Sequence, residues 1–157
     1  MKRNLLAMLS VLAIFAGAIV SAAQAQKSRA ASNGTALVQR PLYTDYKGVR
    51  LGMMPQDVRG ILGDPVLKDA EMDYYVLPDN VTAQVVYDAA HKVKAISVDY
   101  AGGIGAPDYR AVLGEELNNR PDGSAFKMIR YEAQGFWVSY NRTAGPAPIV
   151  TVTLQKI

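Results

Sequence analysis

Cysteine is absent from this 157-residue chain, and histidine and tryptophan each occur only once. Without cysteine the protein can form no disulfide bond, no thiolate metal site and no thiol redox centre. Export signals that end in a lipid anchor attach the acyl chains to a cysteine, so we also expect no lipid anchor. The fold must therefore be stabilised by the packing of its own core.

The scarcity of histidine excludes most nucleophilic active sites. A Ser-His-Asp arrangement needs a positioned histidine, and the one available, His91, lies in a predicted hairpin turn. We interpret it as an exposed turn residue that can contact a partner. We predict that the protein is not an enzyme and has no catalytic residue, cofactor or metal. Acid-base catalysis by ordinary carboxylates or tyrosines stays open as an alternative.

Clusters of lysine and arginine are also missing. The formal net charge is +3, and two of the 17 basic residues but none of the 14 acidic residues lie in the first 25 positions. The remaining 132 residues carry a net charge of about +1 and suit one compact domain or two small halves that share a sheet. We therefore predict no nucleic-acid binding and no polybasic membrane contact.

Residues 1–25 have the pattern of a secretory signal peptide. Lys2 and Arg3 precede an uncharged apolar run at 5–20, and an Ala-x-Ala cleavage site ends at Ala25. The run is short for a membrane-spanning helix, which needs about 20 apolar residues, although retention of the segment as an anchor stays open. We expect a periplasmic or secreted protein after cleavage near Ala25. Residues 26–41 lack apolar periodicity and predict a flexible linker.

Residues 55–62 predict a short helix followed by a three-stranded meander. Pro55 suits the first helical turn, and Gly63 and Pro65 end the helix. Its apolar face is formed by residues spaced three and four apart, Val58, Ile61 and Leu62. Alternating runs rich in β-branched and aromatic residues predict antiparallel strands at 72–77, 81–87 and 93–100.

The second half of the chain repeats this pattern with an offset of 51 residues. The matching pairs are Asp57/Asp108, Arg59/Arg110, Leu62/Leu113 and Gly63/Gly114. Three further strand-like runs follow, at 126–131, 136–141 and 149–154. The glycine-rich joint at 102–105 separates the two halves. We interpret the pattern as an internal duplication.

The predicted fold class is α+β. It consists of two tandem units, each a helix plus a three-stranded antiparallel meander, at 42–101 and 102–157. We expect the two units to join into one sheet, with both helices packed on one face of it.

The first unit resembles the SmpA/OmlA (BamE) domain of bacterial envelope proteins. The resemblance rests on Gly52-Met53, on Asp57-Val58 and on the segment LGDP at 62–65, followed by a meander. It implies a protein-binding or scaffolding role in outer-membrane assembly, with another envelope protein as partner and peripheral association with the outer membrane. The pairing of two units also resembles the β-lactamase inhibitory protein fold, which implies the alternative of a secreted inhibitor of a hydrolase such as a β-lactamase.

This chain departs from the BamE pattern in three respects. It lacks the lipid-bearing cysteine, it has two units rather than one, and Met54 stands where that family usually has a Ser or Thr helix cap. Because a fold does not fix a function, the resemblance supports the fold better than membership of the assembly machine. For the inhibitor alternative, the hairpin turn at 88–92 is the loop best suited to fill an active site.

Strand alternation predicts which side chains face a partner. If Phe136, Val138 and Tyr140 point into the core, Trp137 points away from it. The same logic sends Tyr131 and Tyr75 outward, Tyr75 together with Asp73. We interpret the alternating acids Asp69, Glu71 and Asp73 as a solvated approach to the first strand rather than a cation site. The predicted partner-binding residues are Trp137, Tyr131, Tyr75, His91 and Asp88.

Overall fold

The computed structural model describes residues 40–157. The predicted signal peptide at 1–25 and nearly all of the predicted linker therefore lie outside the described residues. The described elements, in chain order, are α1 (Pro55–Leu62), β1 (Leu67–Lys68), β2 (Met72–Leu77), β3 (Val81–Tyr87), β4 (Val93–Ala101), α2 (Tyr109–Leu113), β5 (Ala125–Tyr131), the 3-10 turn η1 (Glu132–Gln134), β6 (Phe136–Arg142) and β7 (Ile149–Lys156). No helix among residues 40–157 has the length and apolar character to cross a membrane.

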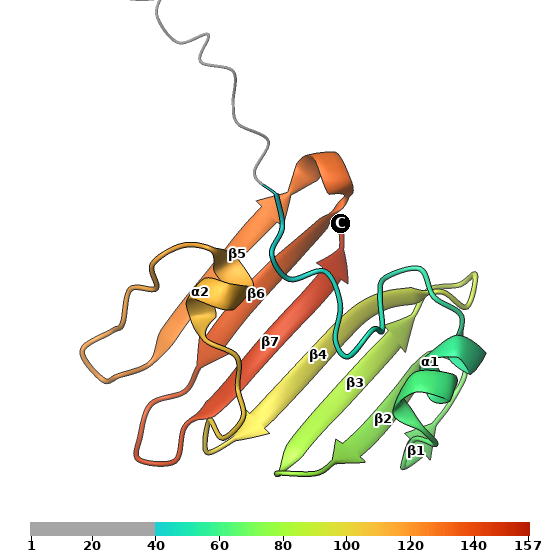
Figure 1. The fold of residues 1–157 in the computed structure, drawn as a ribbon, viewed down its shortest axis with the longest axis horizontal. Coiled ribbons are helices and arrows are strands. Elements are labelled where there is room, and N and C mark those ends of the chain that lie inside the picture. Colours follow the sequence, from blue (N-terminus) through green and yellow to red (C-terminus); the bar gives the residue numbers. More distant parts are fainter. Residues whose placement is uncertain (1–39) are drawn as a thin grey trace, which may run out of the picture. The chain divides into compact units, whose positions relative to one another are not determined.

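All seven strands within residues 40–157 belong to one antiparallel sheet with the order β1-β2-β3-β4-β7-β6-β5 (Figure 1). The first meander contributes β2, β3 and β4, and the second contributes β5, β6 and β7. Their last strands, β4 and β7, pair over seven positions, from Ala95 opposite Gln155 to Ala101 opposite Ile149. The centre of the sheet is thus formed by strands that are far apart in the sequence.

The predicted fold class of two tandem helix-plus-meander units is wrong. The molecule is mostly one seven-stranded sheet, and its two helices within residues 40–157 are short, with α1 spanning eight residues and α2 five. As separate units, the two halves would each leave a long inner strand with an unpaired edge. Pairing β4 with β7 satisfies those backbone groups and merges both halves.

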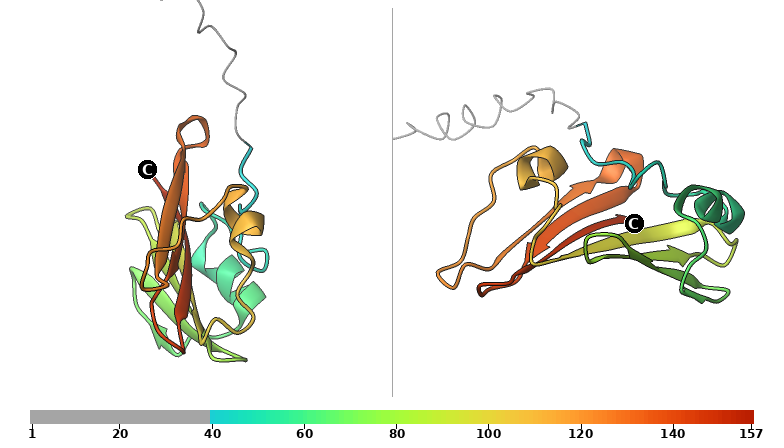
Figure 2. Two further views of the ribbon diagram at one scale, coloured as in Figure 1. Left: turned by 90° about the vertical axis from the view of Figure 1, so that its left-hand side faces the viewer. Right: turned by 60° about the horizontal axis from the view of Figure 1, so that its bottom comes forward.

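The core lies on one side of this sheet. Figure 2 shows α1 and α2 on the same side, and Figure 1 shows residues 40–54 crossing that side between them. This segment contributes Tyr46 and Val49 to the core. Two backbone hydrogen bonds connect it to β4: the Gly52 N–H donates to the Val93 carbonyl, and the Val93 N–H donates to the Met53 carbonyl. The fully buried strand residues include Val85, Ile96, Val98, Val138 and Val152.

The helix ends follow local chemistry. Met54 precedes α1 and makes no side-chain cap, whereas the Asp108 carboxylate accepts a hydrogen bond from the backbone N–H of Arg110 at the start of α2. Gly63 and Gly114 follow the two helices with positive φ angles of 85° and 71°, a region open to glycine because it has no side chain. Gly114 has the left-handed helical conformation, whereas Gly63 combines positive φ with extended ψ.

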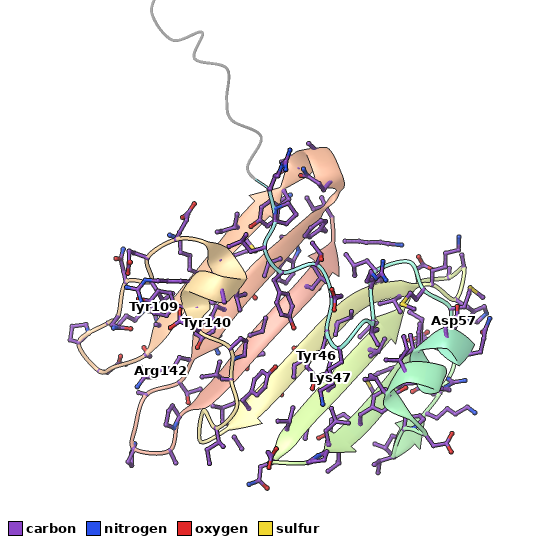
Figure 3. All side chains as sticks on the ribbon, viewed as in Figure 1. Tyr46, Lys47, Asp57, Tyr109, Tyr140 and Arg142 are labelled. Carbon is purple, nitrogen blue, oxygen red and sulfur yellow. The ribbon has the colours of Figure 1, made fainter. Side chains whose placement is uncertain are left out.

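Helix α1 buries less than its periodicity predicts, whereas α2 buries its apolar face. Val58 is fully buried and Leu62 partly buried, but Ile61 is 44 % exposed, so its predicted core position is wrong. α1 lies near the edge of the sheet, beside β1 and β2 (Figure 1), where only part of its surface meets other residues. In α2, Val112 and Leu113 are both buried. Tyr109 packs edge-on against Tyr140 of β6, with ring centroids 6.3 Å apart (Figure 3).

Candidate functional site

The side of the sheet opposite the two helices, here called the open face, carries a central band of uncharged polar side chains. Strand register places hydroxyl and amide groups from adjacent strands in rows across this band, at Gln84, Ser97, Ser139, Asn141, Thr151 and Thr153. The hydroxyl oxygens of Ser97 and Thr153 lie 3.0 Å apart, and the Thr151 hydroxyl donates to the Asp99 carboxylate over 2.6 Å. These bonds hold the band in one arrangement across the β4–β7 junction.

Large apolar side chains surround the polar band. On β2, Val76 is 59 % exposed; on β5, Phe126 and Met128 are 54 % and 41 % exposed. The same register places Leu67 of β1 and Ile149 of β7 on the open face, both exposed. Apolar groups thus extend along both outer parts of the sheet, and none of them is covered by another described element.

Trp137 lies on the open face, as the alternation in 136–141 predicts. It stands between Arg130 of β5 and Gln155 of β7, and it is partly buried rather than fully exposed. The predicted alternation in β6 and β7 is confirmed by the burial of Val138, Tyr140 and the inward residues of β7. The role of Trp137 in binding stays a prediction.

Tyr131 does not face outward. The prediction of which β5 side chains point into the core is therefore wrong. Its side chain is 3 % exposed and packs against the Phe136 ring with centroids 5.3 Å apart. β5 begins at Ala125, which is buried, so that Ala125, Ile129 and Tyr131 face the core while Phe126 and Met128 face water. The sequence contains the signal in the alternation that starts at Ala125, but the bulkier Phe126 and Met128 favour the opposite phase.

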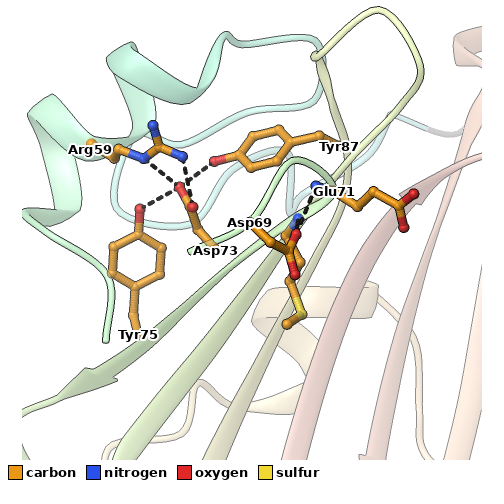
Figure 4. A network of polar contacts seen from close by, with 7 residues as sticks. Arg59, Asp69, Glu71, Asp73, Tyr75 and Tyr87 are labelled. Atoms are coloured by element: carbon orange, nitrogen blue, oxygen red, sulfur yellow. Dashed lines mark hydrogen bonds and ion pairs between the residues drawn. The ribbon is translucent and has the colours of Figure 1, made fainter. Parts of the chain in front are cut away.

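Tyr75 is also buried. Asp73 points into the core rather than outward, and Tyr75, two residues further along β2, points to the same side. The Asp73 side chain is fully buried and makes two hydrogen bonds with Arg59 of α1, each 2.8 Å long (Figure 4). The hydroxyl groups of Tyr75 and Tyr87 donate to the same carboxylate, over 3.2 and 2.7 Å. Asp69 instead accepts hydrogen bonds from the backbone N–H groups of Glu71 and Met72. The interpretation of these acids as one solvated approach is therefore wrong for Asp73.

The polar network around Asp73 is saturated. Burial acts to raise the pKa of this carboxyl, but the hydrogen bonds from Arg59 and Tyr87 lower it by more, so the pKa lies below its ordinary value. Burial, followed by the proximity of Asp73, raises the pKa of the Tyr75 hydroxyl, and burial with the hydrogen bond to Asp73 raises that of Tyr87. A charge held by four donors is suited to anchoring α1 on the sheet rather than to proton transfer.

The repeat-related arginine makes a different contact. Arg110, which matches Arg59 in the duplication, makes hydrogen bonds to both carboxylate oxygens of Glu116, each 2.9 Å long, and both side chains are exposed. The Arg110 guanidinium also lies over the Tyr109 ring, 4.7 Å from its centroid. The two arginines that match in the sequence pattern therefore pair with different kinds of acid, Arg59 with the buried Asp73 and Arg110 with the exposed Glu116.

The hairpin between β3 and β4 contains the predicted residues Asp88 and His91. The Asp88 carboxylate accepts hydrogen bonds from the backbone N–H groups of Ala90 and Lys92 and forms an ion pair with Lys156, over 3.3 Å. The backbone hydrogen bond to Lys92 is the largest cause of the lowered pKa of Asp88. His91 is exposed with a positive φ of 55°, so the structure places it at the tip of a braced turn.

A cavity of about 430 Å³ lies beside this hairpin, lined in part by Glu71, Asp88, His91 and Lys94. Val86, which also lines this cavity, lies in one cross-strand row with Ala95, Gln155 and Trp137, and two strands separate it from Trp137. The structure nevertheless does not bring the five predicted binding residues together. His91 and Asp88 share the hairpin, Tyr75 and Tyr131 are in the core, and Trp137 is on the open face. Within residues 40–157, no group of three or more His, Cys, Asp or Glu residues is arranged to hold a metal ion.

Sequence reasoning missed the exposed apolar residues of the open face. An outward Tyr131 requires Phe126 and Met128 to lie in the core, as large apolar side chains usually do. Their exposure depends on strand phase, which the burial of Asp73 and of Ala125 decides.

No protein-family model matches this chain, and no curated protein matches it. A solved structure with some similarity is a DUF4309 family protein (YjgB) from Bacillus subtilis subsp. subtilis str. 168, which is 14 % identical. The alignment covers 66 % of this chain and 78 % of that chain, with a TM-score of 0.40. A similarity of this size supports no statement about family or function.

Proposed function

We propose that this protein is a non-catalytic exported module that binds another envelope protein through the open face of its sheet. The observation that carries the proposal is the set of large apolar side chains exposed around a polar band on that face. Removing such side chains from water is the dominant favourable contribution to most protein association.

The composition of the open face favours a protein partner. Interface cores are depleted of charge and enriched in aromatic and methionine side chains. The open face has Phe126 and Met128 on β5 and Trp137 on β6, and Arg130, which lies opposite Trp137, is already paired with Glu132. Few unpaired cations accompany these groups, which disfavours a nucleic acid or an anionic membrane.

The rigid backbone of the sheet adds to this argument. Side chains on paired strands have fixed spacing, and the hydroxyl pairs Ser97–Thr153 and Thr151–Asp99 further restrict the polar band. A preformed surface loses less conformational entropy on binding than a mobile loop.

Site-specific photocrosslinking in the exporting cell tests the proposal. A photoreactive residue at position 128, on the open face, should form an adduct with another protein. The matched control is position 104, where Ile104 is an exposed apolar residue outside the sheet. The Phe126→Ser substitution should reduce the adduct at 128 by about tenfold while leaving the thermal midpoint unchanged, because Phe126 contributes little to the core.

Equal adduct formation at 128 and 104, or an adduct that Phe126→Ser does not weaken, would show that the open face is not the binding surface. Export is tested separately by the mass of the protein recovered from the cell. Cleavage near Ala25 gives an N-terminus at or close to Gln26, whereas an intact first segment contradicts it.

The braced hairpin at 88–92 favours a second candidate function, inhibition of an exported hydrolase. The Asp88 carboxylate accepts two backbone hydrogen bonds, from Ala90 and Lys92, and these hold the turn that presents His91. A preorganised loop is what insertion into an active site requires. Periplasmic hydrolases, including β-lactamases, should then lose activity with the wild-type protein and keep it with Asp88→Ala. No inhibition at micromolar excess eliminates this candidate.

A further inference from the structure

A second surface site lies on the helix-bearing side of the sheet, separate from the open face. It is a pocket of about 390 Å³ between the segment at 40–54 and the end of the sheet where β6 begins and β7 ends. Figure 1 shows this segment passing over the sheet near that end. Three parts of the chain therefore form the pocket: the crossing segment, the turn before β6, and the last residues of β7.

The pocket combines an apolar floor with a cationic rim. Leu51, Phe136 and Leu154 supply the apolar surface. Arg50 and Lys156 supply positive charge at the rim. A ligand that fits both features has an apolar group next to an anion.

The positive charge at this rim is only partly compensated. Within residues 40–157, no hydrogen bond or ion pair is formed by the exposed guanidinium of Arg50. Lys156 is paired with Asp88, but over 3.3 Å and with both side chains about one third exposed. An exposed pair of this kind contributes little and can exchange partners. A carboxylate at the rim would gain two cationic donors.

We propose that this pocket binds the free C-terminal carboxylate of a polypeptide whose last residue has a large apolar side chain. The carboxylate is placed against Arg50 and Lys156, and the apolar side chain is placed on Leu51, Phe136 and Leu154. The pocket volume of about 390 Å³ lies at the lower end of the range for ligand sites, which suits one residue and its terminus.

The polar groups of the rim favour a peptide over an aliphatic acid. Thr44 and Gln134 also line the pocket, and their hydroxyl and amide groups can pair with the last peptide bonds of a chain. A fatty acid carries the same carboxylate but has no group that uses these two side chains. Inorganic phosphate leaves the apolar floor unused.

Fluorescence polarisation with a labelled peptide tests this inference on the purified protein. The probe is an acetylated pentapeptide that ends in leucine with a free carboxylate. The comparisons are the same peptide with an amidated end, a peptide that ends in glycine, and decanoate as competitor. We expect amidation or glycine to weaken binding at least about tenfold, and decanoate to compete more weakly than the unlabelled peptide.

Substitutions locate the site. Arg50→Gln and Lys156→Gln should each weaken binding of the free-carboxylate peptide about tenfold. Arg142→Gln is the matched control, because Arg142 is an exposed arginine that lines a different pocket. It should change the affinity by less than about twofold. Thermal midpoints recorded for all three variants show that each remains folded.

Several outcomes overturn the inference. These are no binding at millimolar peptide, equal binding of the amidated peptide, loss of binding in Arg142→Gln as large as in Arg50→Gln, or tighter binding of decanoate than of the peptide. Because the open face lies on the other side of the sheet, failure here leaves the photocrosslinking result at position 128 unaffected. The two proposals can therefore fail separately.

Discussion

At the scale of single residues, Asp73 is a buried carboxylate that accepts four hydrogen bonds. A carboxylate without solvent contact needs partners that replace its water shell, because an unpaired buried charge is strongly unfavourable. Arg59 and the two tyrosines provide them. The network connects α1 to β2 and β3 and thereby sets which side chains of β2 enter the core.

Removing this charge should destabilise the protein. We expect Asp73→Asn to lower the free energy of unfolding by about 2–4 kcal/mol, because the Arg59 guanidinium keeps its partly buried position without its counter-ion. Urea titration measures the change. Glu116→Gln is the matched control, since it removes the exposed partner of the repeat-related Arg110, and it should leave stability essentially unchanged. Equal effects of both substitutions would contradict a special role for Asp73.

The same carboxyl predicts a dependence of stability on acid pH. Its folded-state pKa lies below the ordinary value of 3.8, so its contribution is complete above that pH and is lost as the pH falls through the lower folded pKa. The difference in unfolding free energy between wild type and Asp73→Asn should be constant from pH 7 to about pH 4 and shrink below it. A difference that grows below pH 4 would reverse the sign of the proposed shift.

At the scale of elements, the apolar side chains of the two helices are buried to different extents. Leu113 of α2 is 1 % exposed, whereas Ile61 of α1 is largely exposed. Leu113→Ala should therefore lower the free energy of unfolding by about 2–5 kcal/mol, and Ile61→Ala by less than about 1 kcal/mol. Chemical denaturation of both variants checks the pair. A decrease in the unfolding free energy for Ile61→Ala as large as that for Leu113→Ala would mean that the Ile61 side chain is buried.

The phase of β5 can be tested in the same way. Ile129 faces the core and Met128, its neighbour, faces the open side. Ile129→Ala should cost about 2–4 kcal/mol, while Met128→Ala should cost less than about 1 kcal/mol. The reverse order in thermal or urea unfolding would restore the phase that the bulky residues alone predict.

At the scale of the whole molecule, pairing of β4 with β7 makes the two halves one cooperative unit. Val98 of β4 and Val152 of β7 are both fully buried and occupy opposite positions in this pairing. Domains with a single continuous core usually unfold in one transition. Val98→Ala, in the first half, should therefore lower the urea midpoint reported by Trp137 fluorescence in the second half.

Far-UV circular dichroism provides the second probe of that experiment. It should give the same midpoint as Trp137 fluorescence, before and after Val98→Ala. If the fluorescence midpoint stays unchanged while the dichroism signal shifts, the two halves unfold independently.

The sequence by itself determined the features that depend on neighbouring residues. Helix ends at Gly63 and Gly114 follow from backbone conformations open to glycine. Strand limits follow from turn-forming residues between alternating runs, and the alternation in β6 and β7 correctly placed Trp137 on the open face. These signals need no knowledge of distant contacts.

Only the tertiary structure decided the features that depend on remote partners. Asp73 could enter the core because Arg59 and Tyr87, each 14 positions away, satisfy its charge. Alternation defines two faces of β2 and β5 but not which one meets the core. The sequence predicted one shared sheet but not which strands join its halves; these are β4 and β7, whose paired residues lie 48 to 60 positions apart. Which face of a strand is buried, and which strands pair, depends on the difference in free energy between two complete folds of the chain. A local sequence pattern carries no information about the contacts in the competing fold.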